Sequence, residues 1–361
     1  MTRIIGLMSG TSLDGVDAVA MEFSADGSMQ RLGHQFHPYD PRLRARLLQL
    51  AQASISHNEI ERLLRCAVPL GQAYSDVVLA LIKKLGMTPQ DFRALAIHGQ
   101  TLRHRPQLHY SLQWNHPAWV AEKTGIDVIC DFRARDLAAG GEGAPLVPAF
   151  HQAIFGHVTQ SVIANIGGIA NISILQRPSP FGFDTGPGNM LIDWICQHFF
   201  ACAFDQDGAL ARQGQVRWDL LEKMRQDPYF AQRPPKSTGR EYFHAQWLQP
   251  WIDQASPKDL LCTLTELTAS TLTDAIHRYA PKSQHLWLCG GGALNTYLCR
   301  RIQNYYKGSV QSTAVLGIHP MEVEASAFAW LGYQFLQRKP GNLPAVTNAQ
   351  GFRILGALYP H

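Results

Sequence analysis

The sequence predicts an α/β protein of two lobes, and three observations lead to this prediction. The chain has 361 residues, which is more than one hydrophobic core usually needs, so two domains are expected. Short apolar segments typical of strands alternate with longer segments of helical periodicity in both halves. The second half also begins as the first does, with a strand, a glycine turn and a returning strand. Two such lobes are expected to leave a cleft between them, where ligands commonly bind.

The composition excludes several classes of protein. Hydrophobic residues make up 46% of the chain and charged residues 17%, which is typical of a globular protein and excludes general disorder. The formal charge is +4, and the basic residues are scattered, so we expect no nucleic-acid partner. No apolar run is long enough to span a bilayer, and the N-terminus lacks a signal-peptide core. The seven cysteines include no Cys-x-x-Cys pair. Together these features predict a cytoplasmic protein kept in a reducing compartment.

In the first half, the spacing of apolar residues and glycines sets the order of elements. Residues 3–8 predict a strand, residues 9–15 a turn rich in small residues, and residues 16–23 a returning strand, which together favour a hairpin. The other expected elements of this half are a helix over 41–50, helical sequence over 58–86, a buried strand over 94–97, a helix over 118–124 and a strand over 126–130.

A connection rich in glycine and proline over residues 138–148 predicts the lobe boundary. We therefore assign residues 1–137 to the first lobe and residues 138–361 to the second, with the C-terminal tail allowed to return to the first lobe. The expected elements of the second half are strands over 161–166 and 169–175, a strand over 286–289 followed by a glycine turn and a helix, and an apolar helix over 323–337.

Three glycine turns that each follow a buried strand are candidate phosphate sites. They lie at Gly10 to Gly15, at Gly167 and Gly168, and at Gly290 to Gly292. Without side chains, the main-chain N–H groups of such turns can converge on a phosphate, and Thr11 and Ser12 add hydroxyl donors. The alternative is that each turn only reverses the chain. None of the turns has the P-loop ending or the dinucleotide-binding spacing, so those two folds are not expected.

Three charged residues occupy positions that fit either a catalytic or binding role or a structural role. Asp184 lies between glycines and fits a general base, or alternatively a cap of the helix expected near Asn189. Arg133 follows a strand end and fits a bidentate clamp for a carboxylate, or alternatively an internal salt bridge. Glu324 opens the last helix, where the helix dipole alone explains an acid. The fifteen histidines show no metal-ligand spacing, so a structural metal is not expected.

A series of motifs in a fixed order resembles the anhydro-N-acetylmuramic acid kinase family over nearly the whole chain. These motifs are Gly6 to Asp17, His98 to Thr101, Asp131 to Arg133, Gly140 to Pro148, Asn165 to Asn171, Phe183 to Asn189, Pro235 to Glu241, Gly290 to Asn295, and Glu324 with Ala325.

The resemblance implies the two-lobed actin/hexokinase-like fold, a duplicated RNase H-like arrangement with an interdomain cleft. It also implies a phosphotransferase of cell-wall recycling, with an alcohol group as acceptor. This family converts 1,6-anhydro-N-acetylmuramic acid, ATP and water to N-acetylmuramic acid 6-phosphate and ADP. ATP and Mg²⁺ are the implied cofactors, and the amino sugar is the other small-molecule partner. A homodimer is suggested by the family alone.

The resemblance also implies roles for individual residues. Asp184 would be the general base, Arg133 would meet the lactyl carboxylate, and His98, Thr101 and Glu324 would line the sugar site. The nucleotide would be held by Gly10, Thr11, Ser12, Leu13, Asp14, Gly15, Val16, Asp17, Gly167, Gly168, Gly290, Gly291, Gly292 and Asn295.

The chemistry of the implied reaction fits a site with one acid. Water attacks the anomeric carbon while the bridging oxygen leaves and takes the γ-phosphoryl group. One carboxylate suffices to deprotonate this water, whereas an ordinary glycosidase usually needs two. Asp14 and Asp17 are the candidate Mg²⁺ ligands and Asp184 is a third, because Met8 and Ser9 stand where many relatives of the wider fold carry an aspartate at the end of the first strand.

Two motifs keep more than one interpretation. Where the family commonly has Pro-Asp, this chain has Pro320, Met321 and then Glu322, which supplies the charge one place later. The segment from Lys236 to Glu241 fits either a phosphate contact or a salt-bridge network. Two rival functions also stay open: a kinase of another anhydro-sugar, which would give Arg133 no carboxylate to bind, and a non-catalytic actin-like ATP switch, which would not need Asp184.

Overall fold

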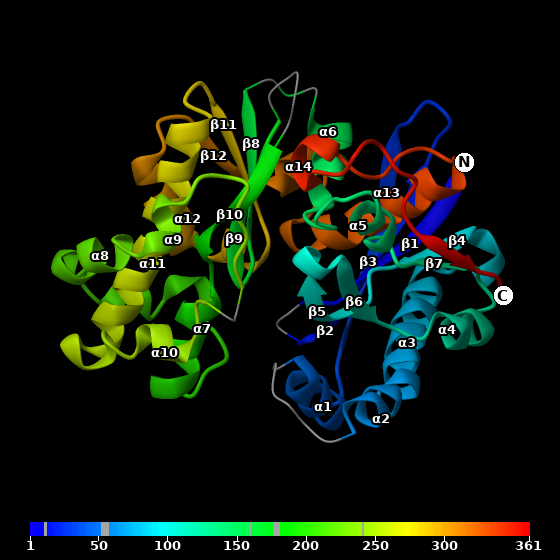
Figure 1. Ribbon diagram of the computed structural model, residues 1–361, viewed down its shortest axis with the longest axis horizontal. Helices are drawn as coiled ribbons and strands as arrows, with labels where there is room; N and C mark the ends of the chain where they lie inside the picture. The colour runs from blue at the N-terminus through cyan, green and yellow to red at the C-terminus, as the bar shows by residue number, and fades with distance from the viewer. Residues whose placement is uncertain (11–12, 52–57, 157, 159, 176–180, 240–241) are drawn as a thin grey trace. The chain divides into compact units, whose positions relative to one another are not determined.

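The computed structural model describes the chain except residues 11–12, 52–57, 157, 159, 176–180 and 240–241. It divides into two compact units, which we call the first unit (Met1–Phe150 with Glu322–His361) and the second unit (His151–Met321) (Figure 1). The sequence placed the lobe boundary between residues 137 and 138. In the structure, the chain changes unit inside helix α6 and returns to the first unit at Glu322.

The first unit has these elements in chain order: β1 (Thr2–Met8), β2 (Gly15–Phe23), β3 (Met29–Pro38), α1 (Pro41–Ala51), α2 (Glu59–Leu64), α3 (Ala67–Leu85), β4 (Ala94–Ile97), β5 (Gln100–Arg105), β6 (Tyr110–Trp114), α4 (Pro117–Thr124), β7 (Val128–Cys130), α5 (Ala134–Ala138), the start of α6 (Val147–Phe155), α13 (Val323–Leu336), α14 (Pro344–Thr347) and β13 (Ala357–Tyr359).

The main sheet of the first unit has the order β13-β7-β4-β1-β2-β3. Strands β1, β2 and β3 form an antiparallel meander, while β4 lies parallel to β1, and β7 lies parallel to β4. The predicted hairpin over residues 3–23 is confirmed, with Met8 opposite Asp17 at its turn end. Strands β5 and β6 form a separate antiparallel ribbon.

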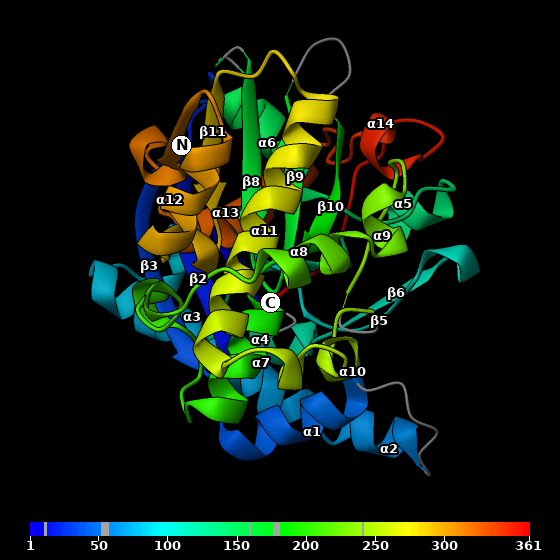
Figure 2. The same ribbon diagram turned by 90° about the vertical axis from the view of Figure 1, so that its left-hand side faces the viewer.

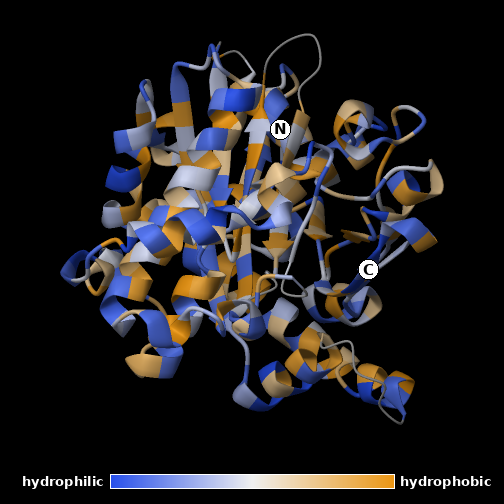
Figure 3. Ribbon diagram, turned by 60° about the vertical axis from the view of Figure 1, so that its left-hand side comes forward, coloured by the Kyte–Doolittle hydropathy of each residue, from blue (hydrophilic) through white to orange (hydrophobic). Residues whose placement is uncertain are grey.

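Both faces of this sheet are buried along its inner strands β1, β2, β4 and β7, whose successive side chains point to opposite faces. In β1, Ile5 and Leu7 belong to the hydrophobic cluster that contains helix α3, while Ile4 belongs to the cluster that contains helix α13. Figure 3 shows hydrophobic colour running along the strands, and outer helices that alternate between hydrophobic and hydrophilic stretches. The helices thus cover a central layer of strands on two sides.

Helix α13 packs directly against the middle of strand β1 because of a glycine. A Cβ atom placed on Gly6 would clash with the main-chain carbonyl of Ala325 and with Ala329. The absence of a side chain at Gly6 therefore lets the helix backbone approach the strand. This contact fixes the start of α13, where Glu324 lies, relative to the end of β1.

The second unit has these elements in chain order: the end of α6, β8 (Ser161–Ile166), β9 (Ile169–Ile174), β10 (Phe181–Pro187), α7 (Met190–Phe199), α8 (Trp218–Arg225), α9 (Pro228–Ala231), α10 (Ala245–Leu248), α11 (Pro257–Tyr279), β11 (His285–Cys289), α12 (Thr296–Tyr305) and β12 (Ser309–Ser312). Short 3-10 turns join these elements in both units, among them Gly291–Leu294 after β11 and Pro320–Glu322 before α13.

The sheet of the second unit repeats the plan of the first. Its order is β10-β9-β8-β11-β12, with an antiparallel meander from β8 to β10 and with β11 parallel to both β8 and β12. Helix α11 crosses the face of the meander beside α12 (Figure 2). The same order, three meandering strands followed by parallel strands, therefore occurs in both units. This duplication confirms the predicted α/β fold of the actin/hexokinase-like class.

Several elements differ from the sequence prediction. The helical sequence over 58–86 forms two helices, because the chain turns at Arg65 and Cys66 between α2 and α3. Asp184 lies within strand β10, and α7 starts at Met190 with Asn189 as its N-cap residue, so Asp184 is not a helix cap. Strand β3 and helix α11 were not predicted. In the part of the chain that the structure describes, no helix combines the length and the apolar character needed to cross a membrane.

The buried histidine His151 makes stability depend on pH. It is 1% exposed, its Nδ1 lies 3.0 Å from the Ser173 hydroxyl, and burial lowers its pKa to about 3. Since the unfolded chain takes up a proton near pH 6.5 and the folded chain does not, stability is lost as the pH falls below 6.5. We expect this group alone to remove about 2 kcal/mol of unfolding free energy between pH 7.5 and pH 5.

Urea titrations at the two pH values check this expectation. The variant His151→Asn should lose about 2 kcal/mol less than the wild type on acidification, while replacement of the exposed His277 by Asn should leave the loss unchanged. Equal acid losses in the wild type and His151→Asn would contradict the assignment.

Candidate active site

Two of the residues that the sequence proposed for the sugar site, His98 and Arg133, lie at one edge of the sheet of the first unit. Strands β1, β4 and β7 run parallel, so their carboxyl ends lie at the same edge, which is where open α/β sheets bind ligands. His98 follows β4 directly and donates its main-chain N–H to the Leu7 carbonyl at 3.0 Å. Arg133 follows the end of β7, after Asp131 and Phe132.

Arg133 and His98 contact each other through their side chains. The Nε and Nη2 atoms of Arg133 lie 3.2 and 2.8 Å from His98 Nε2, and Nη1 donates to the Gly143 carbonyl at 2.7 Å. His98 is 3% exposed, and its burial, reinforced by the Arg133 charge, holds its pKa well below 6.5. The imidazole is therefore neutral, and its Nε2 accepts from the guanidinium. Its buried Nδ1 makes no hydrogen bond of normal geometry.

Two acids balance the Arg133 charge. Burial lowers the pKa of the guanidinium to about 10, while Glu324 and Asp136 act in the opposite direction. Glu324 lies in the first turn of α13, and the His98 ring packs 4.6 Å from Phe328 one turn further along that helix. Arg133 thus stays charged near neutral pH and is partly buried with acidic neighbours. It has no single salt-bridge partner among the described ion pairs.

Thr101 lies on the ribbon β5–β6 instead of on the main sheet. Its hydroxyl accepts a hydrogen bond from Gln113 at 3.2 Å, and Gln113 also donates to Ser111. The ribbon starts two residues after His98, so Thr101 is connected to the sheet edge by a short segment. Its place in a sugar site stays a prediction.

The turn between β1 and β2 is anchored by the residue after His98 and Gly99. Gln100 is fully buried and donates its amide to the Gly10 carbonyl at 3.0 Å, and it accepts from the Tyr39 hydroxyl. Leu13 adopts a positive φ of 60° and is buried, and its carbonyl accepts from Arg44. Gly10 and Leu13 therefore belong to a fixed turn, while Thr11 and Ser12 lie outside the described residues.

The end of this turn leads into strand β2. Asp14 is exposed and lies 3.8 Å from Arg44. Gly15 packs against the β3 main chain, and Val16 is fully buried in the core, so only their main-chain groups can serve a nucleotide. The Asp17 carboxylate accepts a hydrogen bond from His34, with 2.8 Å between His34 Nε2 and Asp17 Oδ1.

Asp17 is the first of four side chains in a series of polar contacts that the sequence did not predict. The others are His34, Glu322 and Arg31. His34 Nδ1 lies 3.7 Å from Glu322 Oε1, and Arg31 binds Glu322 through both Nε and Nη2, with the Nη2 to Oε1 distance at 2.7 Å. Glu322 is 3% exposed. The pairing ties β3 to the first residue of the returning segment, two positions before Glu324. Glu322 therefore supplies an ion pair that holds the start of α13.

The two glycine turns of the second unit lie at one edge of its sheet, and Asn189 binds the chain at the first of them. Strands β8 and β11 are parallel, so Gly167 and Gly290, which follow them, lie at one sheet edge. Asn189 donates its main-chain N–H to the Gly167 carbonyl at 2.8 Å and its side-chain amide to the Ile166 carbonyl at 3.1 Å. Gly168 accepts from Gly188 and Met190. The pairing of β8 with β11 thus brings the predicted turns at 167–168 and 290–292 to one edge, and Asn189 binds the first of these turns.

The third glycine turn leads into helix α12. Gly290 donates to the Pro320 carbonyl at 3.0 Å, Gly291 begins a 3-10 turn, and Gly292 packs on Ile166. Asn295 is 7% exposed and caps α12, with its Oδ1 accepting from the Leu298 N–H at 3.0 Å. The cap accounts for Asn295 locally, and its contact with a nucleotide stays a prediction.

Asp184 is held on three sides by the segment 229–238. Its main-chain N–H donates to the Lys236 carbonyl at 3.2 Å, its carbonyl accepts from the Tyr229 hydroxyl at 2.7 Å, and its Oδ2 accepts from the Thr238 N–H at 3.0 Å. The pairing of β10 with β9 shifts register between Asp184 and Gly186. Such an irregularity redirects a side chain out of the regular sheet.

Lys236 has a defined place beside Asp184. Its Nζ donates to the Tyr229 carbonyl at 3.0 Å and lies 4.3 Å from the centre of the Tyr229 ring. Burial lowers the Lys236 pKa, the charge of Arg278 lowers it further, and Asp184 opposes both. The described part of this motif, residues 236–239, binds Asp184 through main-chain hydrogen bonds, while residues 240 and 241 lie outside the described residues. The phosphate contact and the salt-bridge network both stay predictions.

Asp14 and Asp17, the two candidate magnesium ligands of the first unit, can each offer the ion one carboxylate. Among the described residues, no cluster of three or more His, Cys, Asp and Glu side chains could hold a metal ion. Mg²⁺ in nucleotide sites usually takes one or two carboxylates together with phosphate oxygens and water. Asp14, at the turn, and Asp17, beside it, each offer one carboxylate, so they fit an ion that arrives with a nucleotide.

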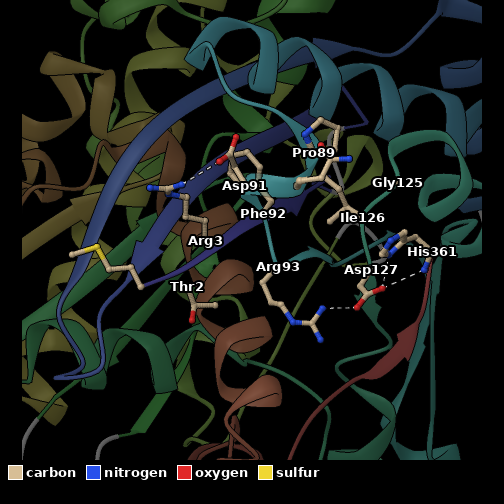
Figure 4. A pocket seen from close by; sticks show the side chains of 12 residues that line it. Thr2, Arg3, Pro89, Asp91, Phe92, Arg93, Gly125, Ile126, Asp127 and His361 are labelled. Atoms are coloured by element: carbon tan, nitrogen blue, oxygen red, sulfur yellow. Dashed lines mark hydrogen bonds and ion pairs between the residues drawn. The ribbon is translucent and has the colours of Figure 1, made fainter.

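A separate pocket of about 470 Å³ opens at the opposite edge of the sheet of the first unit (Figure 4). It lies at the amino ends of the parallel strands, where Arg3, Arg93 and Asp127 precede or begin β1, β4 and β7. Its charges pair with one another: Arg93 with Asp127 at 2.6 Å, His361 with the same carboxylate at 2.9 Å, and Arg3 with Asp91 at 3.6 Å. These ion pairs join neighbouring segments at the amino ends of the strands. Since the charges are already paired, we assign the pocket no ligand.

The two α/β sheets of similar topology place the chain in the actin/hexokinase-like class. Comparison with known proteins then identifies the family. A family model described as anhydro-N-acetylmuramic acid kinase matches residues 2–361, and the chain belongs to this family. The anhydro-N-acetylmuramic acid kinase of Nitrosomonas europaea is 48% identical, with 99% of each chain covered. That of Ralstonia nicotianae is 44% identical, with 99% of this chain and 97% of the relative covered.

Solved structures show only distant likeness. The activator of 2-hydroxyisocaproyl-CoA dehydratase from Clostridium difficile with bound ADPNP gives a TM-score of 0.49 at 11% identity, covering 93% of this chain and 96% of that chain. Component A of the Acidaminococcus fermentans (R)-2-hydroxyglutaryl-CoA dehydratase also gives 0.49, at 8% identity, covering 91% and 96%.

The ion pair of Arg31 with Glu322 should stabilise the first unit more than an exposed pair does. Arg31→Met leaves the buried Glu322 carboxylate with only the more distant His34, and we expect a loss of about 2 kcal/mol of unfolding free energy. The matched variant Arg65→Met removes the exposed pair with Glu61 and should cost less than about 0.5 kcal/mol. Urea titration of both variants measures the difference, and equal losses would show that Glu322 does not depend on Arg31.

Proposed function

We propose that the protein is an ATP-dependent kinase that opens the anhydro ring of 1,6-anhydro-N-acetylmuramic acid with water and phosphorylates its O6, as part of cell-wall recycling in the cytoplasm. The products are N-acetylmuramic acid 6-phosphate and ADP. The family match over residues 2–361 carries this proposal. The charged Arg133 at a ligand-binding sheet edge supports it, because the lactyl group of this sugar is a carboxylate.

In the first unit, Arg133 binds the lactyl carboxylate. Its planar guanidinium presents paired N–H groups that match a carboxylate, and the neutral His98 orients it without competing charge. Glu324 and Thr101 accept and donate hydrogen bonds to sugar hydroxyl and amide groups. The acid Glu324 also limits the excess positive charge that Arg133 would otherwise carry when no sugar is bound.

In the second unit, Asp184 takes the proton from the attacking water. The water oxygen forms a bond to the anomeric carbon as the bond from that carbon to the bridging oxygen breaks. The bridging oxygen then carries the γ-phosphoryl group as O6, and ADP leaves. Because phosphorus captures the departing oxygen, no second acid is needed. The hydrogen bonds of Asp184 to the Thr238 and Lys236 main chain keep its carboxylate in one orientation.

The nucleotide is held by main-chain groups of the glycine turns. Gly10 to Asp17 serve the phosphates from the first unit, Gly167 and Gly168 serve them from the second, and Gly290 to Gly292 with Asn295 contact the adenosine. Asp14 or Asp17 holds the magnesium ion, which when bound neutralises charge on the phosphates. Gln100 keeps the first turn fixed through the Gly10 carbonyl.

An assay with purified protein tests the proposed reaction. With Mg-ATP and the acidic anhydro-sugar, we expect ADP release that depends on the sugar, and a product heavier than the sugar by phosphate and water. The same assay with neutral anhydro-sugars provides the comparison. Turnover only on neutral sugars would mean a different substrate, and ADP release indifferent to every sugar would exclude a sugar kinase.

The variant Asp184→Asn tests the general base. The amide still accepts from the Thr238 N–H, so the variant should fold and bind ATP, while kcat should fall by at least about a hundredfold because no group accepts the water proton. Asp274→Asn, which removes an exposed partner of Arg225, should leave kcat unchanged. Near-normal turnover by Asp184→Asn would remove this residue from the base role.

A further inference from the structure

We infer that Asp136, together with Asn342 and Thr347 of the C-terminal segment, positions the Arg133 guanidinium and so sets the preference for an acidic sugar. This inference rests on the proposed function, because it concerns the carboxylate that Arg133 binds. None of the three residues follows from the chemistry of the reaction. Their role comes from a continuous set of buried hydrogen bonds in the first unit.

Asp136 is a fully buried carboxylate whose two oxygens are both used. Oδ1 accepts from Asn342 Nδ2 at 2.8 Å and from Thr347 Oγ1 at 2.7 Å, and Oδ2 accepts from the Gly143 N–H at 2.8 Å. Asp136 and Thr347 are 0% exposed, and Asn342 is 2% exposed. A buried carboxylate is costly unless such donors surround it. The geometry of the carboxylate is therefore set by residues more than 200 positions away in the chain.

Gly143 connects Asp136 to Arg133 through hydrogen bonds of its main chain. Its N–H donates to Asp136, and its own carbonyl accepts from Arg133 Nη1 at 2.7 Å. Arg133 is the N-cap residue of the short helix α5, and Asp136 lies in the first turn of that helix. The guanidinium is thus fixed through its backbone by α5 and through its Nη1 by Gly143, and both supports meet at Asp136.

The loop between α5 and α6 is shaped to bring these groups together. A Cβ atom on Gly141 would clash with Asp136 Oδ2, so only glycine leaves room for the carboxylate there. The main chain of the C-terminal segment binds the same loop, with Glu142 donating to the Thr347 carbonyl and Gln350 donating to the Ala139 carbonyl, both at 2.7 Å. The segment from 342 to 350 therefore acts as a brace behind the loop that carries Gly143.

A brace of this kind should affect binding of the acid more than catalysis. A bidentate contact between guanidinium and carboxylate depends on orientation, and displacements near 1 Å weaken such contacts strongly. Loss of one Asp136 donor lets the carboxylate and the Gly143 peptide shift, and Arg133 shifts with them. The neutral part of the sugar and the nucleotide do not contact Arg133 in the proposed function, so their binding should stay the same.

Steady-state kinetics on the full-length protein test this inference. The substrates are the acidic anhydro-sugar and the same anhydro-sugar without its lactyl group, each with saturating Mg-ATP. We expect Thr347→Val to raise KM for the acidic sugar about fivefold, and Asp136→Asn to raise it by more than about tenfold, as the loss of one or two buried hydrogen bonds implies. The kcat values and the KM for the neutral sugar should change less than about twofold.

Three further variants serve as controls. Thr347→Ser keeps the hydroxyl and should keep the wild-type KM. Thr124→Val removes a buried threonine hydroxyl that bonds only within helix α4 among the described contacts, and it should have no effect on either sugar. Arg133→Ala should abolish the preference for the acidic sugar. Its KM for that sugar gives the largest increase expected for Thr347→Val and Asp136→Asn.

The outcomes separate the inference from the proposed function. If the wild type prefers the acidic sugar and Thr347→Val and Asp136→Asn keep that preference in full, the brace is refuted and the function stands. The brace is also refuted if these variants raise KM for both sugars equally while the melting temperature falls, because that result reports general loosening. If the wild type shows no preference or no turnover, the proposed carboxylate clamp fails, and the inference fails with it.

Discussion

The parallel pairing of strands in each sheet positions the residues of the candidate site. When two strands run parallel in a sheet, the residues that follow them lie at the same edge. Pairing of β1 with β4 and of β4 with β7 brings His98 and Arg133 together, and pairing of β8 with β11 does the same for Gly167 and Gly290. Each unit therefore forms its part of the candidate site from segments far apart in the chain.

Charged groups at these edges are compensated in different ways. His98 stays neutral beside Arg133, Glu322 is held by Arg31, and the Asp184 carboxylate accepts from the Thr238 N–H in the segment that also carries Lys236. Each group thus has a partner of complementary charge or dipole, which holds its side chain in one orientation. The same requirement explains why buried polar residues such as Gln100 and Asp136 occur beside the glycine motifs.

Some of the site could have been anticipated more fully from the sequence. Asn189 and Gln100 lie inside motifs that had been singled out, and buried amides next to glycine turns often hold a turn carbonyl. The other supports gave no local signal. Thr347 and Asn342 lie in a segment of ordinary composition, and Arg31 lies on a strand that was not predicted because its alternation is weak, with glycine and histidine in its middle.

The sequence alone determined the α/β class, the duplicated strand–turn–strand openings, most elements of strong periodicity and the motif residues from Gly10 to Glu324, because these depend on local spacing and turn chemistry. Tertiary structure alone decided the rest. It returned the chain to the first unit at Glu322, split the helical sequence at Arg65 and Cys66, and placed Asp184 in a strand held by residues 229–238. It also joined Asp136 to the C-terminal segment. Each of these depends on contacts between distant residues, whose partners no local pattern specifies.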